Sequence, residues 1–536
     1  MVQYIVIGGG SAGCVVAARL SENPHASVVL LEEGPSDRNP YIHLPVGFYK
    51  TSQGSLVEHY PWQPEPGYSG PANPSMVQAR VLGGGATVNA MVYLRGQPAD
   101  YDQWSRAGAE GWGYADVLPF FLKHEANDRF NNASHATRGP VGVSDQRFTH
   151  PLARIWVQAC QEAGMAFNPD FNSGSQDGCG FYQVNTRHGR RSSTSVAYLK
   201  PARKRPNLEV RTGTRVLRVI LRNARAVGVE YLRGGKVERL FAEGEVIVCA
   251  GAINSPRLLM LSGIGAADAL GPHGIETQVD LPGVGRNLQD HIEVSLINEL
   301  HAPLSYDRYK KPHWKLYAGL QYLLFRNGPA SSNIVEGGAF WRTSQAEGRA
   351  DAQYCFMAGA GVEAGVDSVP GGNGCTLNVC QTRPRSVGSV ALHSADPMAK
   401  PLIRPNYLGD PHDVECMAEA VEYGRHIMAQ SVIARHIRRE FVPARPLRSR
   451  EDYRAFVRQS AHGALHPVGT CRMGSDEEAV VDSQLRVRGV EGLRVIDNSV
   501  APNLCSSNTN AMAIMIGEKG AHHVLHPTGK ATLSAP

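Results

Sequence analysis

The sequence predicts a mixed α/β protein with a parallel sheet covered by helices and a second region rich in strands. Three observations lead to this prediction. An apolar strand, a glycine-rich turn, a helix and a second apolar strand follow one another within residues 4–34. Further glycine-rich turns feed short helices at residues 79–104 and 251–265, and a strand, a loop and a helix follow at 493–521. Between residues 295 and 460, strand-like runs alternate with a helical pattern, which indicates a separate layer of structure.

Composition describes an ordinary folded protein. The chain has 536 residues, of which 42% are hydrophobic and 19% are charged, and these values suit a protein with large cores. The formal net charge of +5 is small for this length, and no cluster of lysine and arginine suggests nucleic acid as a partner. The ten cysteines form no CxxC pair, so we interpret them as buried free thiols.

The N-terminus and the apolar runs bear on location. "MVQYIVIGGG" begins a strand at once, with no charged region ahead of it. No apolar run approaches the roughly 18–20 residues that a membrane helix needs. We therefore expect no signal peptide, no transmembrane segment and a cytoplasmic protein, with peripheral attachment to a membrane left open.

The glycine-rich turn has the spacing of a dinucleotide-binding unit. After the strand at Tyr4–Ile7, the glycines Gly8, Gly10 and Gly13 occupy the GxGxxG positions, and the second strand ends at Glu32. Gly8 allows a tight turn, Gly10 lets the backbone approach a pyrophosphate, and Gly13 lets helix and strand pack closely. The helix N-terminus attracts phosphate, and an acid in the position of Glu32 accepts hydrogen bonds from ribose hydroxyls. The sequence therefore predicts a bound dinucleotide, either FAD or NAD.

The rest of the chain favours FAD. No second motif of this kind follows, and NAD would need a substrate domain downstream. FAD is usually held by several distant segments, and such segments are present: "ARVLGGGATVNAMVYLRGQPADYDQW" (79–104), "GAINSPRLLMLSGIG" (251–265), "LPGVGRNLQDH" (281–291) and "LRVIDNSVAPNLCSSNTNAMAIMIGEKGA" (493–521).

Together these ordered segments resemble those of the glucose–methanol–choline (GMC) oxidoreductases, flavoenzymes that oxidise alcohols. The resemblance runs through nearly the whole chain. Two further stretches, "NPYIHLPVGFYK" (39–50) and "SSNIVEGGAFW" (331–341), are similar to bacterial dehydrogenases acting on L-sorbose, polyethylene glycol or aliphatic alcohols.

The resemblance implies a fold and a division of the chain. The implied fold is α/β + β, of the GMC and p-hydroxybenzoate hydroxylase type. A Rossmann-like FAD-binding domain would be assembled from residues 1–145, 200–295 and 460–536. A substrate-binding domain, built on a large antiparallel sheet over the face of the flavin, would take residues 145–200 and 295–460. The stretch 52–75, rich in proline, glycine and serine, is predicted to be a long irregular loop.

The resemblance also implies which residues hold the cofactor. The predicted cofactor-binding residues are Gly8, Gly10, Ser11, Ala12, Gly13 and Glu32 for the ADP half, Val216 for the adenine, Arg80, Gly84, Asn89, Ala90, Met91 and Val92 for the flavin ring and pyrophosphate, Asp497 and Asn498 near the ribityl chain, and Asn508 and Thr509 at the pyrimidine edge. Ala86 stands where the family signature usually has Gly, Ser or Thr. Val88 stands where members with covalently attached flavin carry histidine, so we predict non-covalent FAD.

The family's active site pairs a histidine in a His-Pro turn with a His or Asn 44 positions later, which here implies His466 and Asn510. Oxidation of an alcohol transfers a hydride from carbon to flavin N5 while the hydroxyl proton leaves. Imidazole has a pKa suited to a base near neutral pH, and an amide N–H can stabilise the developing alkoxide. We therefore predict His466 as the general base and Asn510 as the orienting donor.

Other interpretations of these residues stay open at this point. His462 and His466 are spaced i and i+4 like metal ligands, but Gly463 and Pro467 disfavour a helix and no carboxylate completes a site, so no metal is predicted. Asn510 could instead cap the helix that follows it. The remaining candidates are His291 and Asp290, as structural or cofactor-supporting residues, and His301, His313 and Trp314, as cavity-lining or solvated residues.

The predicted activity is FAD-dependent oxidation of a primary or secondary alcohol to an aldehyde or ketone. The electron acceptor is a quinone, a cytochrome or O2, and the chain is expected to be a monomer or homodimer. Three alternatives share these residues: an alcohol oxidase that makes hydrogen peroxide, a flavin-bearing hydroxynitrile lyase, and a binding module without catalysis.

Overall fold

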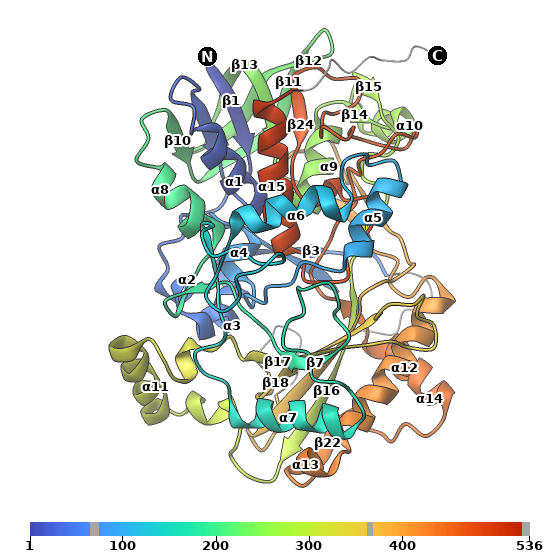
Figure 1. The fold of residues 1–536 in the computed structure, drawn as a ribbon. Helices are drawn as coiled ribbons and strands as arrows, with labels where there is room; N and C mark the ends of the chain where they lie inside the picture. The colour runs from blue at the N-terminus through green and yellow to red at the C-terminus, as the bar shows by residue number, and fades with distance from the viewer. Residues whose placement is uncertain (65–73, 362–367, 528–536) are drawn as a thin grey trace.

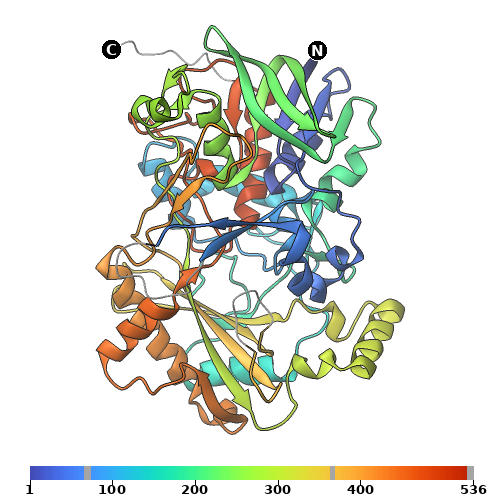
Figure 2. The same ribbon diagram turned by 180° about the vertical axis from the view of Figure 1, so that it is seen from behind.

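A computed structural model describes residues 1–64, 74–361 and 368–527. Two sheets organise the chain, one in each half of the molecule as drawn in Figure 1. The chain passes between the halves several times, so each half contains segments far apart in the sequence (Figures 1 and 2).

The first sheet has a parallel core, as the N-terminal pattern predicts. Its parallel strands follow the order β10-β2-β1-β13-β24, with bounds β10 (Leu208–Arg211), β2 (Val28–Leu31), β1 (Val2–Ile7), β13 (Lys236–Val248) and β24 (Leu493–Val495). The first part of β13 also pairs antiparallel with β12 (Arg225–Arg233), which pairs with β11 (Thr214–Arg222). The central strands are continuous apolar runs because both faces of the sheet are covered.

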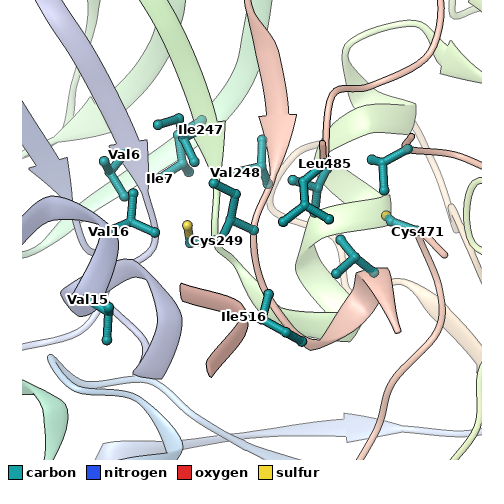
Figure 3. Packing of buried hydrophobic residues seen from close by; sticks show 14 of the residues in the cluster. Val6, Ile7, Val15, Val16, Ile247, Val248, Cys249, Cys471, Leu485 and Ile516 are labelled. Carbon is teal, nitrogen blue, oxygen red and sulfur yellow. The ribbon is translucent and has the colours of Figure 1, made fainter. Parts of the chain in front are cut away.

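Helices from several parts of the chain pack beside this sheet. They are α1 (Ser11–Leu20), α15 (Asn510–Leu525), α6 (Tyr114–His124), α5 (Pro98–Arg106) and α9 (Gly251–Leu261). α1 and α9 contact the sheet strands, α15 packs on α1, and α6 and α5 lie outside α15. Figure 3 shows Val15, Val16 and Ile516 in the same apolar cluster as the sheet residues Val6 and Val248. α15 approaches α1 closely because it carries a glycine there. A Cβ on Gly517 would lie 3.0 Å from the carbonyl oxygen of Ala12.

The second sheet is antiparallel, and it confirms the predicted fold class. Its order is β22-β16-β19-β18-β17-β7, and β23 (His462–Gly463) pairs with β16. The strands are β7 (Gly178–Phe181), β16 (Ile292–Leu300), β17 (Val335–Trp341), β18 (Ala352–Met357), β19 (Gly374–Gln381) and β22 (Ile437–Val442). The helices α7 (Pro151–Glu162), α12 (Pro411–Met428) and α14 (Arg450–Ser460) accompany it, and Trp156 of α7 stacks on Phe356 of β18 at 5.3 Å between ring centroids.

One predicted loop contains a strand. The sequence predicts an irregular stretch at 52–75, but β3 (Val57–Pro61) pairs antiparallel with β4 (Ser75–Ala79). Tyr60 and Met76 of this hairpin pack in one apolar cluster, and this burial outweighs the local composition. Residues 65–73 of the predicted loop lie outside the described residues. The predicted division into two domains stays a prediction; β16 begins at Ile292, ahead of the boundary at 295.

One helix stands at the edge of the molecule. α11 (Pro312–Phe325) lies beside the antiparallel sheet half in both views (Figures 1 and 2). None of the helices within the three described ranges is both long and apolar enough to cross a bilayer.

Candidate cofactor and substrate site

A cavity of about 860 Å³ extends from the glycine turn after β1 to the antiparallel sheet. This volume falls in the upper part of the range of about 300–1,000 Å³ that is usual for ligand sites. Both predicted catalytic residues line the cavity, and so does every predicted cofactor-binding residue except Gly13. The structure therefore brings together segments separated by up to several hundred positions.

The three glycines of the turn differ in what surrounds them. Gly8 has a φ of +97°, and a Cβ there would lie 2.4 Å from the carbonyl oxygen of Cys249. A Cβ on Gly13 would lie 1.9 Å from the carbonyl oxygen of Gly8, so this glycine lets α1 pack against β1. A Cβ on Gly10 would meet no protein atom closer than 3.9 Å. Gly8 and Gly13 therefore serve the fold, while Gly10 leaves space open toward the cavity.

Two helix N-termini converge at this turn. Ser11 begins α1, and its Oγ donates a 2.8 Å hydrogen bond to Oδ1 of Asn510, which begins α15. The same Oγ accepts a hydrogen bond from the backbone N–H of Ala86 at 3.3 Å. Neither Gly10 nor Thr509, the N-cap residues, makes a side-chain capping bond. Two positive helix ends with uncapped N–H groups form a site suited to a diphosphate.

Glu32 is held in the cavity wall by backbone donors. Its carboxylate accepts hydrogen bonds of 2.7 Å from the N–H groups of Gly9 and Gly34. Burial raises the pKa of this carboxyl, and the two N–H donors oppose that effect. Each carboxylate oxygen keeps a free lone pair, so Glu32 can still accept from a ribose hydroxyl.

Asp497 and Asn498 lie between α9 and α15. Oδ2 of Asp497 accepts from the N–H of Gly251 at 2.9 Å and from the Ser255 hydroxyl at 2.5 Å, so this carboxylate fixes the start of α9. Asn498 donates to the carbonyl of Thr509 at 3.3 Å, but its Oδ1 is buried with no partner in the protein. An unpaired buried acceptor is costly unless a ligand satisfies it. The orphan acceptor and the converging helix ends fit a dinucleotide such as FAD.

His466 sits at the other end of the cavity in a chain of hydrogen bonds. Its Nδ1 lies 2.9 Å from Nδ1 of His291, and Nε2 of His291 lies 2.9 Å from the carbonyl oxygen of Cys505. Because a carbonyl only accepts, His291 must carry its proton on Nε2, and its Nδ1 must accept from Nδ1–H of His466. The Nε2 of His466 is therefore the unprotonated nitrogen. It lies 3.2 Å from the side-chain Nδ2 of Asn508, which donates to it.

The surroundings keep both imidazoles neutral. Burial lowers the pKa of His466 well below its usual value, and His291 lowers it further. Burial also lowers the pKa of His291 to about 4. The loop is fixed by Asp290, whose carboxylate accepts from the N–H of His466 at 2.7 Å and from the hydroxyl of Tyr407 at 2.7 Å. Burial raises the pKa of Asp290 to about 7.

The structure shows Asn508 in contact with His466, while the role of Asn510 as the orienting donor stays a prediction. Asn508, not Asn510, makes the hydrogen bond with the imidazole. Asn510 is the first residue of α15, and its side chain turns toward Ser11 on α1 instead. The spacing of 44 residues does not predict this contact, because the residue at which α15 begins decides which asparagine reaches the imidazole. The alternative that Asn510 caps this helix is not supported, since Thr509 is the N-cap residue.

The metal alternative finds no support in the geometry around His462. That residue lies on β23, and Leu465 has a φ of +64°, so His462 and His466 do not share a helical face. Nε2 of His462 lies 3.4 Å from the carboxylate of Glu293, while both nitrogens of His466 are engaged elsewhere. Within the described residues, no group of three or more potential metal ligands occurs.

Sequence reasoning missed part of the cavity wall. Glu293, Ser295 and Ile297 of β16 face the cavity, and the alternation of this strand was a signal that could have identified them. The hairpin β3–β4 contributes a second group: Tyr60, Trp62 and Met76. The cavity wall does not include the candidate lining residues His301, His313 and Trp314.

Comparison with known proteins agrees with this architecture. The model of the GMC oxidoreductase family matches residues 2–293 with its N-terminal part and 384–517 with its C-terminal part. The chain belongs to the GMC oxidoreductase family. It is 40% identical to an alcohol dehydrogenase [acceptor] of Pseudomonas putida over 541 residues, covering 100% of this chain and 98% of that protein. It is also 40% identical to a mitochondrial choline dehydrogenase of Mus musculus over 532 residues, covering 97% and 88%.

A solved structure supports the same fold. Pyridoxine 4-oxidase from Mesorbium loti superimposes with a TM-score of 0.89 at 30% identity, covering 99% of this chain and 100% of that one. GMC oxidoreductases bind FAD, and the chain is a flavoprotein oxidoreductase that acts on alcohol-type donors. The narrower likeness to L-sorbose and polyethylene glycol dehydrogenases is not supported by these relatives, whose names are alcohol and choline dehydrogenase.

Proposed function

We propose that this protein is an FAD-dependent alcohol dehydrogenase that oxidises a primary or secondary alcohol to an aldehyde or ketone, with His466 as the general base. The observation that carries the proposal is the chain from Cys505 through His291 to His466. It leaves a neutral imidazole with its unprotonated Nε2 at the cavity wall. A neutral base beside a polar donor is the arrangement that removal of a hydroxyl proton requires.

Asn508 takes the role first expected of Asn510. A substrate hydroxyl between the two side chains would donate its proton to Nε2 of His466 and accept from Nδ2 of Asn508. It would thereby replace their direct contact of 3.2 Å. As the proton moves to His466, the growing negative charge on the alcohol oxygen is stabilised by the amide N–H. Gln353 donates to Oδ1 of Asn508 at 3.4 Å, which keeps the amide in the donating orientation.

The cofactor would be held by the residues that line the other end of the cavity. The diphosphate would lie at the N-termini of α1 and α15, Glu32 would bind a ribose, and Asn498 would gain a donor for its orphan oxygen. FAD, when bound, supplies the two-electron acceptor for the hydrogen on the alcohol carbon. Val88 lines the cavity with a side chain that cannot form a covalent bond, and this supports non-covalent attachment.

The first test is reduction of the flavin by an alcohol without oxygen. Wild-type protein should lose its flavin absorbance, while His466→Gln should keep FAD and reduce it about 100-fold to 10,000-fold more slowly. His462→Gln is a matched control, because His462 lines the same cavity outside the hydrogen-bond chain, and it should affect the rate far less. Flavin reduction by His466→Gln at the wild-type rate would contradict the assignment. Absence of flavin reduction by any alcohol in the wild type as well would favour a binding module.

The range of alcohols is the next question. Glu293 places a carboxylate in the cavity wall, and one relative is named choline dehydrogenase, so the panel should include choline beside aliphatic, aromatic, glycol and sugar alcohols. Pyridoxine belongs in it as well, because a solved structure of similar fold is named pyridoxine 4-oxidase. Release of cyanide from a cyanohydrin without loss of flavin absorbance would instead indicate a hydroxynitrile lyase.

An oxidase is the second candidate, favoured by the structural similarity to pyridoxine 4-oxidase. The two activities share all the residues above and differ in how the reduced protein is reoxidised. Mixing reduced protein with air or with a quinone distinguishes them. Faster reoxidation by the quinone supports the dehydrogenase, and rapid reoxidation by air with formation of peroxide supports the oxidase.

A further inference from the structure

The helix α11 (Pro312–Phe325) exposes an apolar face that no described part of the protein covers. Six large apolar side chains on it are between 50% and 72% exposed: Leu316, Tyr317, Leu320, Leu323, Leu324 and Phe325. At 100° per residue, the first five span an arc of about 120°. In a globular protein an arc of this width normally faces the core. Here it faces outward, at the edge of the molecule in Figures 1 and 2.

The opposite face of α11 is anchored. Ala318 and Tyr322 are buried in a small cluster with Ala330, and the Tyr322 hydroxyl donates to the carbonyl oxygen of Gly189 at 3.0 Å. The helix is therefore already formed and oriented before any partner arrives. A preformed surface saves the ordering cost that a flexible segment would incur on binding.

The charge around the apolar face is almost entirely positive. Between positions 306 and 326 the sequence has five lysine or arginine residues and a single acid, Asp307. Asp307 is buried and paired with Lys310 at 2.6 Å, so it offers no negative charge to a partner. Lys311 and Lys315 are exposed beside the first turn. An apolar face bordered by cations fits a partner that presents hydrocarbon beneath a layer of negative charge.

Aromatic residues lie between the apolar face of α11 and the cations that border it. Trp314 lies under the guanidinium of Arg308, 4.0 Å from its ring centroid, and packs edge-on against Tyr317 at 5.9 Å. Tryptophan and tyrosine with flanking cations are typical of the interface between lipid tails and headgroups.

A second copy of the chain fits this surface less well. Pairing of two α11 helices in either direction would bring cations of one copy near cations of the other, with no exposed acid in the segment to compensate. We therefore propose that α11 is a docking helix that lies in the interface of an anionic phospholipid bilayer, with its leucine face in the acyl region. The helix has 14 residues, which is too short to cross the bilayer. The proposal does not depend on the identity of the substrate.

Vesicle sedimentation of the full-length, FAD-loaded protein tests the proposal. The protein should bind vesicles of phosphatidylcholine with phosphatidylglycerol, bind pure phosphatidylcholine weakly, and dissociate as salt is raised. Leu320→Gln/Leu324→Gln should lower the vesicle affinity by about tenfold or more, since each leucine loses its apolar contact with the lipid. Lys311→Glu/Lys315→Glu should remove the preference for phosphatidylglycerol.

A matched control separates this face from general surface hydrophobicity. Val237 and Met398 are exposed elsewhere, at 59% and 51%, and Val237→Gln/Met398→Gln should bind vesicles like the wild type. Absence of vesicle binding, or binding that survives the Leu320→Gln/Leu324→Gln substitution, overturns the proposal. Sedimentation velocity without lipid gives the other decisive result. A wild-type dimer that becomes a monomer in that variant would assign the face to a second copy.

Discussion

The turn after β1 allows one motif to be separated into a part needed for folding and a part needed for the cofactor. We expect Gly10→Ala and Gly13→Ala to fail in different ways, although both belong to the same GxGxxG pattern. Gly13→Ala would place a Cβ 1.9 Å from the carbonyl oxygen of Gly8, far inside van der Waals contact. The helix must then move away from β1, at a cost of about 3 kcal/mol or more in the free energy of unfolding.

Gly10→Ala has no such conflict in the protein. Gly10 has a φ of −74° and a ψ of −165°, which alanine also adopts, and its Cβ would lie 3.9 Å from the nearest protein atom. The FAD-free protein should therefore unfold within about 1 kcal/mol of the wild type, with a slight gain because alanine restricts the unfolded chain. The added methyl group would occupy the space of the pyrophosphate, so FAD affinity should fall about tenfold or more.

Two measurements check this pair. Urea unfolding of the FAD-free protein, followed by circular dichroism, gives stability, and titration with FAD gives affinity. Gly10→Ala should be stable but bind FAD weakly, and Gly13→Ala should be unstable before FAD is added. If both variants lose the same stability without FAD, or if Gly10→Ala binds FAD like the wild type, the separation of roles is refuted.

Three further outcomes follow from the hydrogen bonds and buried charges. His291→Phe should lower kcat about tenfold or more at unchanged FAD content, because His466 loses the acceptor that fixes its tautomer. Stopped-flow measurement of flavin reduction gives the rate, and an unchanged rate would contradict this role of His291. Asn508→Ala should slow flavin reduction, whereas Asn510→Ala should mainly weaken FAD binding, since Asn510 bonds to Ser11 on α1. The reverse result would support Asn510 as the donor that acts with His466. Burial raises the pKa of the Glu336 carboxyl from 4.5 to about 7, so the folded state holds this proton more tightly than the unfolded chain. The stability from this group is full below about pH 4.5, and about 3 kcal/mol is lost as the pH rises through 7. Glu336→Gln should flatten the dependence of urea midpoints on pH between about pH 5 and 8, and an unaltered slope would show that this carboxyl does not titrate as described.

Local patterns in the sequence predicted local structure well. The apolar runs before and after the glycine turn became β1 and β2, and the helix expected at 411–429 is α12 (Pro411–Met428). These elements depend on periodicity and on the conformational freedom of glycine, both of which are visible within a few residues. The antiparallel sheet was different. Periodicity predicts strand-like runs in this region and the family resemblance implies the sheet, but the order of the strands depends on pairings between distant segments.

Contacts between distant residues also limited what the sequence predicted of the candidate site. His466 was identified by its motif, but its two partners were not assigned. His291 lies 175 positions away and meets the imidazole only because β16 and β23 pair next to each other. Asn508 and Asn510 are two positions apart, and which one reaches His466 depends on the residue at which α15 begins. Residue counting carries no information about either contact.

The parallel sheet begins with β1 and is completed by β24, and α1 is covered by α15. During synthesis, the first strand and helix therefore wait for residues 493–525, the last described elements to leave the ribosome. Until then, apolar side chains such as Val15 and Val16 lack their partners, and a chaperone would have to shield them. The cofactor-binding end of the cavity also forms late, because Ser11 can bond to Asn510 only after α15 has been synthesised. Retention of flavin would thus mark a chain translated through α15, and a chain that stops before β24 should remain colourless and be degraded.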